Sequence, residues 1–228
     1  MRILVILQAR MSSSRLPGKV LKIVNGKPVI YWHISRILKA KLVDSIIVAT
    51  STDASDDVLV DFLSSIGIKS YRGSLNNVFS RYLEISELES PEVIVRLTAD
   101  CPLFMPELLD QMLVNFSRLD CDYYSNIDPP SFPDGLDIEI FKSKSLNSLS
   151  KFELTNQELE HVTIGIRNRR DLFNQLNFPN NVDMSMKRWT LDTQEDLDFI
   201  SAIYGELIGK ETEFSFQDVL EVEKRIEK

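Results

Sequence analysis

The chain has 228 residues, of which 43% are hydrophobic and 26% charged, and its formal net charge is −8. This length suits a single domain, and the acidic charge argues against general binding to nucleic acids or to anionic membranes. The charge is unevenly spread, because residues 1–43 contain nine Lys and Arg and no Asp or Glu. A basic segment in an acidic protein predicts a local binding site for an anion.

The two cysteines, Cys101 and Cys121, do not form a CxxC pair and are too few for a disulfide framework. We therefore expect a reducing, cytoplasmic setting. The apolar run at residues 3–7 is too short for a signal peptide or a membrane helix. It predicts a buried strand in a soluble protein with no membrane partner.

Short runs rich in β-branched residues recur along the first half of the chain, at 3–7, 45–50 and 93–98. Such runs are typical of parallel strands that are buried on both faces. Helical patterns lie between and after these runs, at 28–40, 55–67, 76–90 and 106–118. Pro28, Ser55 and Pro106 are suitable first or capping residues for three of these helices. This alternation predicts an α/β fold: an open, mostly parallel sheet in three layers, with helices on both faces.

The middle of the chain has a different pattern. Residues 121–141 contain three prolines, a PDG turn signal and the alternating segment LDIEIF, which together favour an antiparallel addition to the sheet. Residues 156–169 are predicted to form one helix. We expect a single domain over 1–228, with a protruding arm within about 121–180.

The last part of the chain carries two helix-start signals. A short strand is predicted to precede Asp192, and Thr193 with Asp196 has the spacing of a capping box for the next helix. Ser215 and Asp218 repeat this pattern for a final helix. The two helices should therefore begin directly after Thr193 and directly after Ser215.

The loop that follows the first strand is the strongest functional signal. Ligands of open α/β sheets bind beyond the carboxyl ends of the strands, and this loop leaves such an end. Arg10, Arg15 and Lys19 suit phosphate oxygens, and Ser12–Ser14 add hydroxyl and backbone donors. We favour a phosphate-binding loop over the alternative, a solvated basic loop.

Two aspartates follow predicted strands, Asp100 and Asp192. Mg²⁺ prefers one or two carboxylates together with phosphate oxygens, so the pair suits a metal site if both residues reach the same sheet edge. The alternative for Asp100 is an ordinary loop or capping aspartate. For Asp192 taken alone, helix capping is the better explanation.

Other polar residues are candidates for substrate contacts. Asp137 and Glu139 should point to one face of a strand, where they could bind substrate hydroxyls or simply face solvent. His161 could bind substrate or lie on an amphipathic helix. Asn77 and Arg81 share one helical face and could contact a nucleotide or each other.

Six segments taken together resemble the cytidylyltransferase family that makes CMP-activated sugar acids, and most closely its subgroup named after the spore coat polysaccharide biosynthesis protein SpsF. The segments are QARMSSSRLPGKVL, GSLNNVFSRY, VIVRLTADCPL, PDGLDIEIF, EHVT and RWTLDTQEDL. They fall in the family's order and span residues 3 to about 200. One departure is Ser12, where the subgroup usually has Gly, and a Cβ there hinders a positive φ or a close phosphate approach.

The resemblance implies a nucleotide-diphospho-sugar transferase fold, a CTP substrate, Mg²⁺ as cofactor and a homodimer, with the arm as dimerisation element. It implies catalytic roles for Arg15, Lys19 and Asp100, and metal binding by Asp100 and Asp192. The implied acceptor residues are Asp134, Asp137, Glu139 and His161. The implied nucleotide-binding residues are Ala9, Arg10, Ser12, Ser13, Arg15, Lys19, Gly73, Asn77, Arg81, Thr98 and Asp100.

The implied reaction is attack by a sugar-acid hydroxyl on the α-phosphorus of CTP, with release of pyrophosphate, in the synthesis of a surface polysaccharide or glycan. Such transfers rely on positioning and charge stabilisation and need no protein nucleophile. Two alternatives stay open. One is a glycosyltransferase of the same fold that uses a nucleotide sugar, and the other is a non-catalytic nucleotide-binding subunit.

Overall fold

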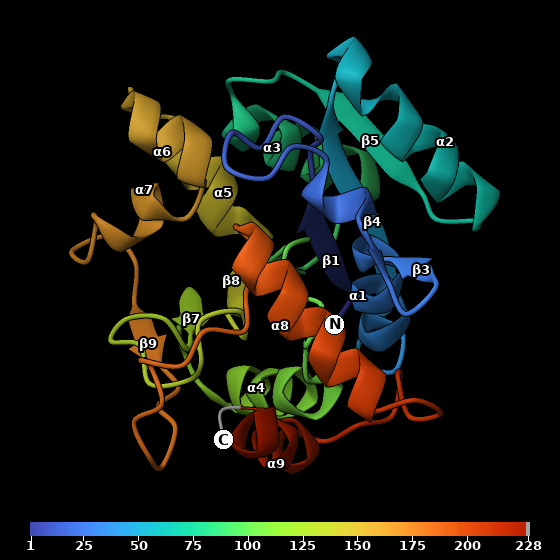
Figure 1. Cartoon of the computed structure of the whole chain (residues 1–228). Helices are drawn as coiled ribbons and strands as arrows, with labels where there is room; N and C mark the ends of the chain where they lie inside the picture. Colours follow the sequence, from blue (N-terminus) through green and yellow to red (C-terminus); the bar gives the residue numbers. More distant parts are fainter. Residues whose placement is uncertain (227–228) are drawn as a thin grey trace.

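A seven-stranded sheet forms the centre of the computed structural model, which describes residues 1–226 (Figure 1). Its strands lie in the order β5-β4-β1-β6-β8-β7-β9. In chain order they are β1 (Ile3–Gln8), β4 (Ser45–Ser51), β5 (Ser70–Gly73), β6 (Val93–Thr98), β7 (Tyr123–Ser125), β8 (Glu139–Lys142) and β9 (Gln175–Asn177). A separate hairpin pairs β2 (Ile23–Val24) with β3 (Lys27–Pro28).

The sheet is parallel in its first half and mixed in its second. β1 pairs in parallel with β4 and β6, and β5 pairs in parallel with β4. β8 runs antiparallel to both β6 and β7, which confirms the antiparallel addition predicted from the alternating segment. The chain builds outward from β1 through β4 to β5 and then returns to β6, so the strand order reverses between β1 and β6.

The central strand β1 shows why the sheet is covered on both faces. Ile3, Val5 and Leu7 pack into one hydrophobic core, and Leu4 and Ile6 pack into the other. Because successive side chains of a strand point to opposite faces, a continuous apolar run needs two apolar layers. The predicted three-layer α/β architecture is confirmed.

The helices divide between these two cores. The first core, which contains the odd-numbered side chains of β1, is covered by α1 (Val29–Ile37), α2 (Asp57–Ser65), α4 (Pro106–Arg118), α8 (Gln194–Glu206) and α9 (Phe216–Ile226). The second is covered by α3 (Val78–Glu89), α5 (Ser143–Leu149), α6 (Asn156–His161) and α7 (Ile164–Arg167). In Figure 1, α8 crosses in front of the sheet and α6 lies at the upper left.

Several predicted boundaries need correction. Residues 156–169 are not one helix, because Val162 adopts a φ of +49° between α6 and α7. Ser55 is not a cap: the Asp53 side chain accepts its backbone N–H and caps a 3₁₀ turn, Ala54–Asp56, that precedes α2. Pro28 is the residue before α1 rather than its first residue.

The segment before Asp192 is not a strand. Apart from one bridge between Arg188 and Asp134, its backbone bonds to loops, and Leu191 donates its N–H to the carbonyl of Asp100 at 2.8 Å. The capping box of Thr193 and Asp196 is present as predicted. This segment therefore connects α8 directly to the loop that follows β6.

Residues 121–180 hold β7, β8, α5, α6, α7 and β9. Their role as a dimerisation arm stays a prediction. Among residues 1–226 no helix has both the length and the apolar character needed to cross a membrane.

Candidate active site

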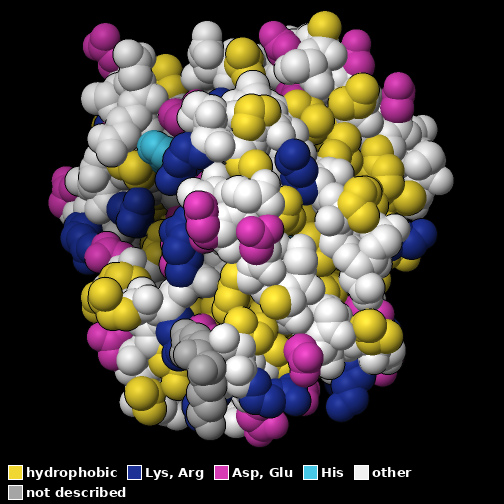
Figure 2. Space-filling model, viewed as in Figure 1, with side chains coloured by type: hydrophobic (Ala, Val, Ile, Leu, Met, Phe, Trp, Pro, Cys, Tyr) yellow, Lys and Arg dark blue, Asp and Glu magenta, His cyan; other side chains and the backbone are white. Residues whose placement is uncertain are grey.

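A cavity of about 480 Å³ opens over the carboxyl ends of β1 and β6, where the strand order reverses. Ligands of open α/β sheets bind at such a reversal. Figure 2 shows Lys and Arg side chains gathered beside a histidine at the upper left of the molecule. The charged residues that line the cavity are Arg10, Arg15, Lys19, Arg96, Asp100, Glu160 and Asp192.

The loop after β1 forms one wall of this cavity and is held by a buried aspartate. The N–H of Met11 donates to Asp56 Oδ1 at 2.7 Å, and the Thr50 hydroxyl donates to Asp56 Oδ2 at 2.9 Å. Burial alone would raise the pKa of Asp56, but these hydrogen bonds and those from Ser51 outweigh it and lower the pKa. Asp56 is therefore an ionised anchor for the basic loop.

The loop turns back at Gly18. This residue has a φ of +68°, and its N–H donates to the carbonyl of Met11 at 3.0 Å. Glycine adopts this left-handed conformation without steric cost. The turn leads directly into the 3₁₀ helix Lys19–Leu21, which places Lys19 at the cavity.

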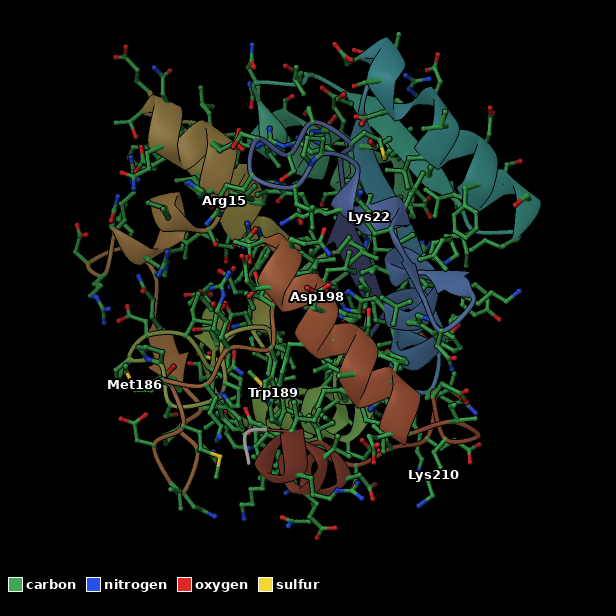
Figure 3. The ribbon with its side chains drawn as sticks, viewed as in Figure 1. Arg15, Lys22, Met186, Trp189, Asp198 and Lys210 are labelled. Atoms are coloured by element: carbon green, nitrogen blue, oxygen red, sulfur yellow. The ribbon has the colours of Figure 1, made fainter. Side chains whose placement is uncertain are left out.

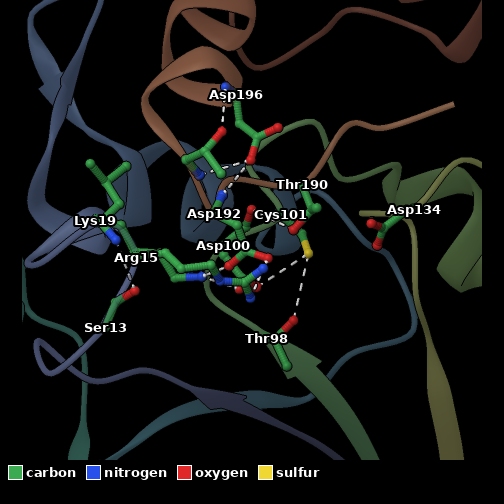
Figure 4. Close-up of polar contacts among 12 residues, drawn as sticks. Ser13, Arg15, Lys19, Thr98, Asp100, Cys101, Asp134, Thr190, Asp192 and Asp196 are labelled. Atoms are coloured by element: carbon green, nitrogen blue, oxygen red, sulfur yellow. Dashed lines mark hydrogen bonds and ion pairs between the residues drawn. The ribbon is translucent and has the colours of Figure 1, made fainter.

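Lys19 joins the two predicted metal ligands. Its Nζ donates to Asp100 Oδ2 and to Asp192 Oδ1, each at 2.6 Å (Figure 4). Burial would lower the pKa of Lys19, but attraction to Asp100 and Asp192 outweighs it and raises the pKa. In the same way, burial would raise the pKa of Asp100, but Lys19 lowers it. Both groups are therefore charged, and the two carboxylates converge on one point.

Two arginines complete the charge cluster around Asp192. Arg15 contacts Asp192 Oδ2 at 2.9 Å, and Figure 3 shows Arg15 on the basic loop close to the first turn of α8. Arg188 lies 3.3 Å from the same oxygen and also pairs with Asp134 and Asp196 at 2.9 Å each. Asp134 is thus held by Arg188, to one side of the Asp100 cluster (Figure 4).

Asp192 is positioned by the start of α8. Asp196 Oδ2 accepts the backbone N–H groups of Asp192 and Thr193, each at 2.8 Å. Trp189 is fully buried, and its ring lies 5.2 Å from that of Phe216 of α9, with the two ring planes tilted by 52° (Figure 3). Asp192 is therefore held in place by the start of α8 and by the buried segment that precedes it.

A second cavity, of about 310 Å³, adjoins the first. Arg96, Thr98 and His161 line both cavities, so the two meet beside the carboxyl end of β6. Asp137 and Glu139 both line the second cavity. Only Glu139 lies in a strand, because β8 begins at Glu139, so the predicted strand does not include Asp137.

Glu139 is committed to a buried ion pair. It is 3% exposed, one of its carboxylate oxygens accepts from Arg96 Nη1, and the other accepts from the Tyr123 hydroxyl at 2.7 Å. Its role in the structure is to hold Arg96 in the wall shared by the two cavities. Direct substrate binding by Glu139 stays a prediction.

Asp137 differs from Glu139 because no residue pairs with it among residues 1–226. Burial, together with the negative charges of Asp134 and Glu139, raises its pKa to about 7. A carboxyl group with a pKa near neutrality can accept and release a proton at physiological pH. The Asp137 carboxyl group is therefore suited to proton transfer in the second cavity.

Three predicted nucleotide-binding residues do not line either cavity: Gly73, Asn77 and Arg81. Asn77 caps α3 by accepting the N–H of Ser80 at 2.8 Å. Arg81 is fully buried and packs against Gly73, where a Cβ would lie 2.6 Å from Arg81 Cγ. The structure brings together the other predicted residues, Ala9, Arg10, Ser12, Ser13, Arg15, Lys19, Thr98 and Asp100.

Ser12 does not need the conformational freedom of glycine. The non-glycine residues with positive φ among residues 1–226 are Asn25, Ser90 and Val162. Ser12 therefore has ordinary backbone geometry, and it is exposed at the cavity. The strained positive φ that a Cβ would hinder is therefore not present at this position. The effect of the Ser12 Cβ on the approach of a phosphate stays a prediction.

Sequence reasoning missed three residues that shape the site. Arg96 interrupts an otherwise apolar strand, and this interruption was a usable signal. Asp56 lies shortly after β4, just as Asp100 lies shortly after β6, so its position after a predicted strand was a usable signal. Glu160 pairs with Arg10 at 3.2 Å, and no local pattern marks that long-range contact.

Comparison with known proteins agrees with this geometry. The family model described as cytidylyltransferase matches residues 4–226. The chain belongs to the cytidylyltransferase family. It is 34% identical over 209 residues to the spore coat polysaccharide biosynthesis protein SpsF of Bacillus subtilis, covering 89% of this chain and 86% of that protein.

Solved structures of cytidylyltransferases show the same fold. A cytidylyltransferase of Leptospira borgpetersenii superposes with a TM-score of 0.93 at 31% identity, over 99% of this chain and 95% of that one. A CMP:2-keto-3-deoxy-manno-octonic acid synthetase complexed with CTP superposes with a TM-score of 0.68 at 17% identity, over 90% and 99% of the chains. The predicted nucleotide-diphospho-sugar transferase fold is thereby confirmed.

Proposed function

We propose that this cytidylyltransferase transfers CMP from CTP to a sugar acid and releases pyrophosphate, in the synthesis of a surface polysaccharide or glycan. The observation that carries the proposal is the convergence of Lys19, Asp100 and Asp192 at the cavity over β1 and β6. The family membership, the SpsF relative and the CTP complex of a structural neighbour support the nucleotide and the pathway class.

The carboxylates of Asp100 and Asp192 fit Mg²⁺. One oxygen of each lies 2.6 Å from the same atom, Lys19 Nζ, so a cation already occupies the space between them. Mg²⁺ usually takes one or two carboxylates and completes its shell with water and substrate phosphates. When bound, it would neutralise charge on the phosphates of CTP.

The residues of the basic loop would hold the triphosphate. Arg10 and Arg15 present guanidinium groups at the cavity, and Ser12 and Ser13 present hydroxyl groups. Lys19 would exchange its contacts with the aspartates for contacts with phosphate oxygens. Arg15 and Lys19 would then stabilise the negative charge that develops on the leaving pyrophosphate.

The acceptor would enter the second cavity. Its hydroxyl oxygen would form a bond to the α-phosphorus as the bond from that phosphorus to the pyrophosphate oxygen breaks. The hydroxyl proton would pass to the Asp137 carboxylate, whose pKa of about 7 suits a general base. No protein group therefore acts as a nucleophile: Asp137 accepts the proton, and the other groups act by position and charge.

Pyrophosphate release tests the proposal. The chain is incubated with CTP, Mg²⁺ and a panel of sugar acids, and Asp100→Asn is expected to lower the rate by about 10²–10³. Asp198→Asn is the matched control, because Asp198 is exposed on α8 and lines neither cavity. Consumption of nucleotide sugars without pyrophosphate would instead favour the glycosyltransferase, and nucleotide binding with no turnover would favour the non-catalytic subunit.

A further inference from the structure

The cations that the basic loop presents to the first cavity are each paired with a carboxylate of the same chain. Two of them, Arg15 and Lys19, contact the aspartates that fit Mg²⁺. The third, Arg10, places its Nη2 atom 3.2 Å from Oε1 of Glu160. The proposed reaction gives Glu160 no task, although its carboxylate holds the guanidinium that would bind phosphate.

The pair of Arg10 and Glu160 joins two walls of the cavity. Arg10 follows β1, whereas Glu160 lies at the end of α6, and both residues line the first cavity. Figure 1 shows the loop after β1 reaching toward α6. The next residue, His161, lines both cavities, so the pair ties the basic loop to the element that borders the acceptor side.

This ion pair is weak enough for a ligand to break it. The side chain of Arg10 is 39% exposed and that of Glu160 is 30% exposed. Ion pairs that water reaches contribute little, because solvent screens the attraction between the charges. A triphosphate carries several charged oxygens, which match the two parallel N–H groups of a guanidinium, so it should displace a single carboxylate.

We infer that Glu160 is an internal competitor of phosphate for Arg10. It holds Arg10 in the empty cavity, yields it to the triphosphate of CTP, and takes it back as pyrophosphate leaves. The pair thereby lowers the affinity for both phosphate ligands and favours release of the product. This inference rests on the proposed function, because it concerns the triphosphate of the same reaction.

A double-mutant cycle measured by calorimetry tests the competition. Wild type, Glu160→Gln, Arg10→Met and the double variant are titrated with Mg²⁺ and the non-hydrolysable α,β-methylene analogue of CTP, and separately with Mg²⁺ and pyrophosphate. Gln keeps the shape of Glu160 and removes its charge. Glu153→Gln is the matched control, because Glu153 is exposed just before α6 and lies outside both cavities.

We expect Glu160→Gln to bind the analogue and pyrophosphate about 2- to 5-fold more tightly than wild type, as for the loss of one solvent-exposed ion pair. In the Arg10→Met background the same substitution should have no effect, because the residue for which Glu160 competes is absent. Glu153→Gln should bind both ligands as wild type does, and circular dichroism should show all variants folded.

Several results would overturn the inference. Unchanged or weaker binding to Glu160→Gln would show that Glu160 does not compete with the ligand, and weaker binding would make it a direct contact of the nucleotide. Equal tightening with and without Arg10 would show that the negative charge acts at a distance and not through this pair. Tightening of the analogue without tightening of pyrophosphate would remove the role in product release.

The wild-type chain separates this inference from the proposed function. If it binds the CTP analogue but the cycle shows no coupling between Arg10 and Glu160, the competition is wrong and nucleotide binding stands. If it binds neither the analogue nor pyrophosphate, the proposed function itself is wrong and the inference fails with it.

Discussion

Replacement of Asp137 by Asn should change how the stability of the protein depends on pH. The carboxyl group of Asp137 has a pKa of about 7 in the folded chain, against an ordinary value of 3.8. Burial contributes most to this rise, followed by repulsion from Asp134 and Glu139. Between these two pH values the Asp137 carboxyl group therefore keeps its proton in the folded chain and loses it in the unfolded chain.

The sign of the effect follows from proton linkage. Between pH 3.8 and about 7 the folded chain binds more protons at this site than the unfolded chain, so the free energy of unfolding falls as pH rises. A rise of about 3 in pKa corresponds to about 4 kcal/mol in the absence of screening. Asp137 is partly enclosed by protein, which raises its pKa, but it is still reached by the solvent of the open cavity. Because this solvent screens the charge, we expect about 1–2 kcal/mol.

Urea denaturation of wild type and Asp137→Asn at several pH values between 4 and 8 measures this effect. Wild type should lose about 1–2 kcal/mol relative to the variant as the pH rises through this range, because Asn does not titrate. Asp198→Asn, on the exposed surface of α8, should follow wild type at every pH. Parallel stability curves for wild type and Asp137→Asn would show that the pKa of Asp137 is not raised, and would remove it as a candidate base.

Three further changes test other parts of the site. Lys19→Met should lower pyrophosphate release by about 10²–10³ while the chain still folds, as judged by circular dichroism; an unchanged rate would exclude Lys19 from the reaction. Glu139→Gln should destabilise the chain by about 3–5 kcal/mol in urea, because Arg96 keeps its buried charge without a partner, and a loss below about 1 kcal/mol would contradict this. Gly135→Ala should lower the melting temperature, because Gly135 has a φ of +108° and a Cβ would lie 2.6 Å from the Trp189 backbone; an unchanged value would mean that this turn relaxes freely.

Much of the fold could be predicted because its signals are local. The apolar runs at 3–7, 45–50 and 93–98 became β1, β4 and β6, since only a doubly covered sheet buries such runs. The helix from Pro106 to Arg118 and the capping box at Thr193 also appear where the sequence placed them. In each case the decisive residues lie within one or two turns of each other.

Parts of the candidate site could be predicted for the same reason. The position of Arg10, Arg15 and Lys19 directly after the first strand indicated an anion-binding loop, and the structure places all three at the cavity. The sequence could not show that Asn77 uses its side chain to cap α3 and that Arg81 is buried. Both residues have polar side chains that suit either role, and only packing decides between the two.

The sequence by itself determined the doubly covered sheet and the basic loop, because strand periodicity, turn residues and charge clusters act over short distances. The tertiary structure alone decided that Lys19 meets Asp100 and Asp192, which lie 81 and 173 residues further along the chain. It also decided that the charge of Arg96 is compensated by Glu139, which lies 43 residues further along the chain. Such pairings depend on which strand ends and helix ends meet in space, and no spacing along the chain encodes them.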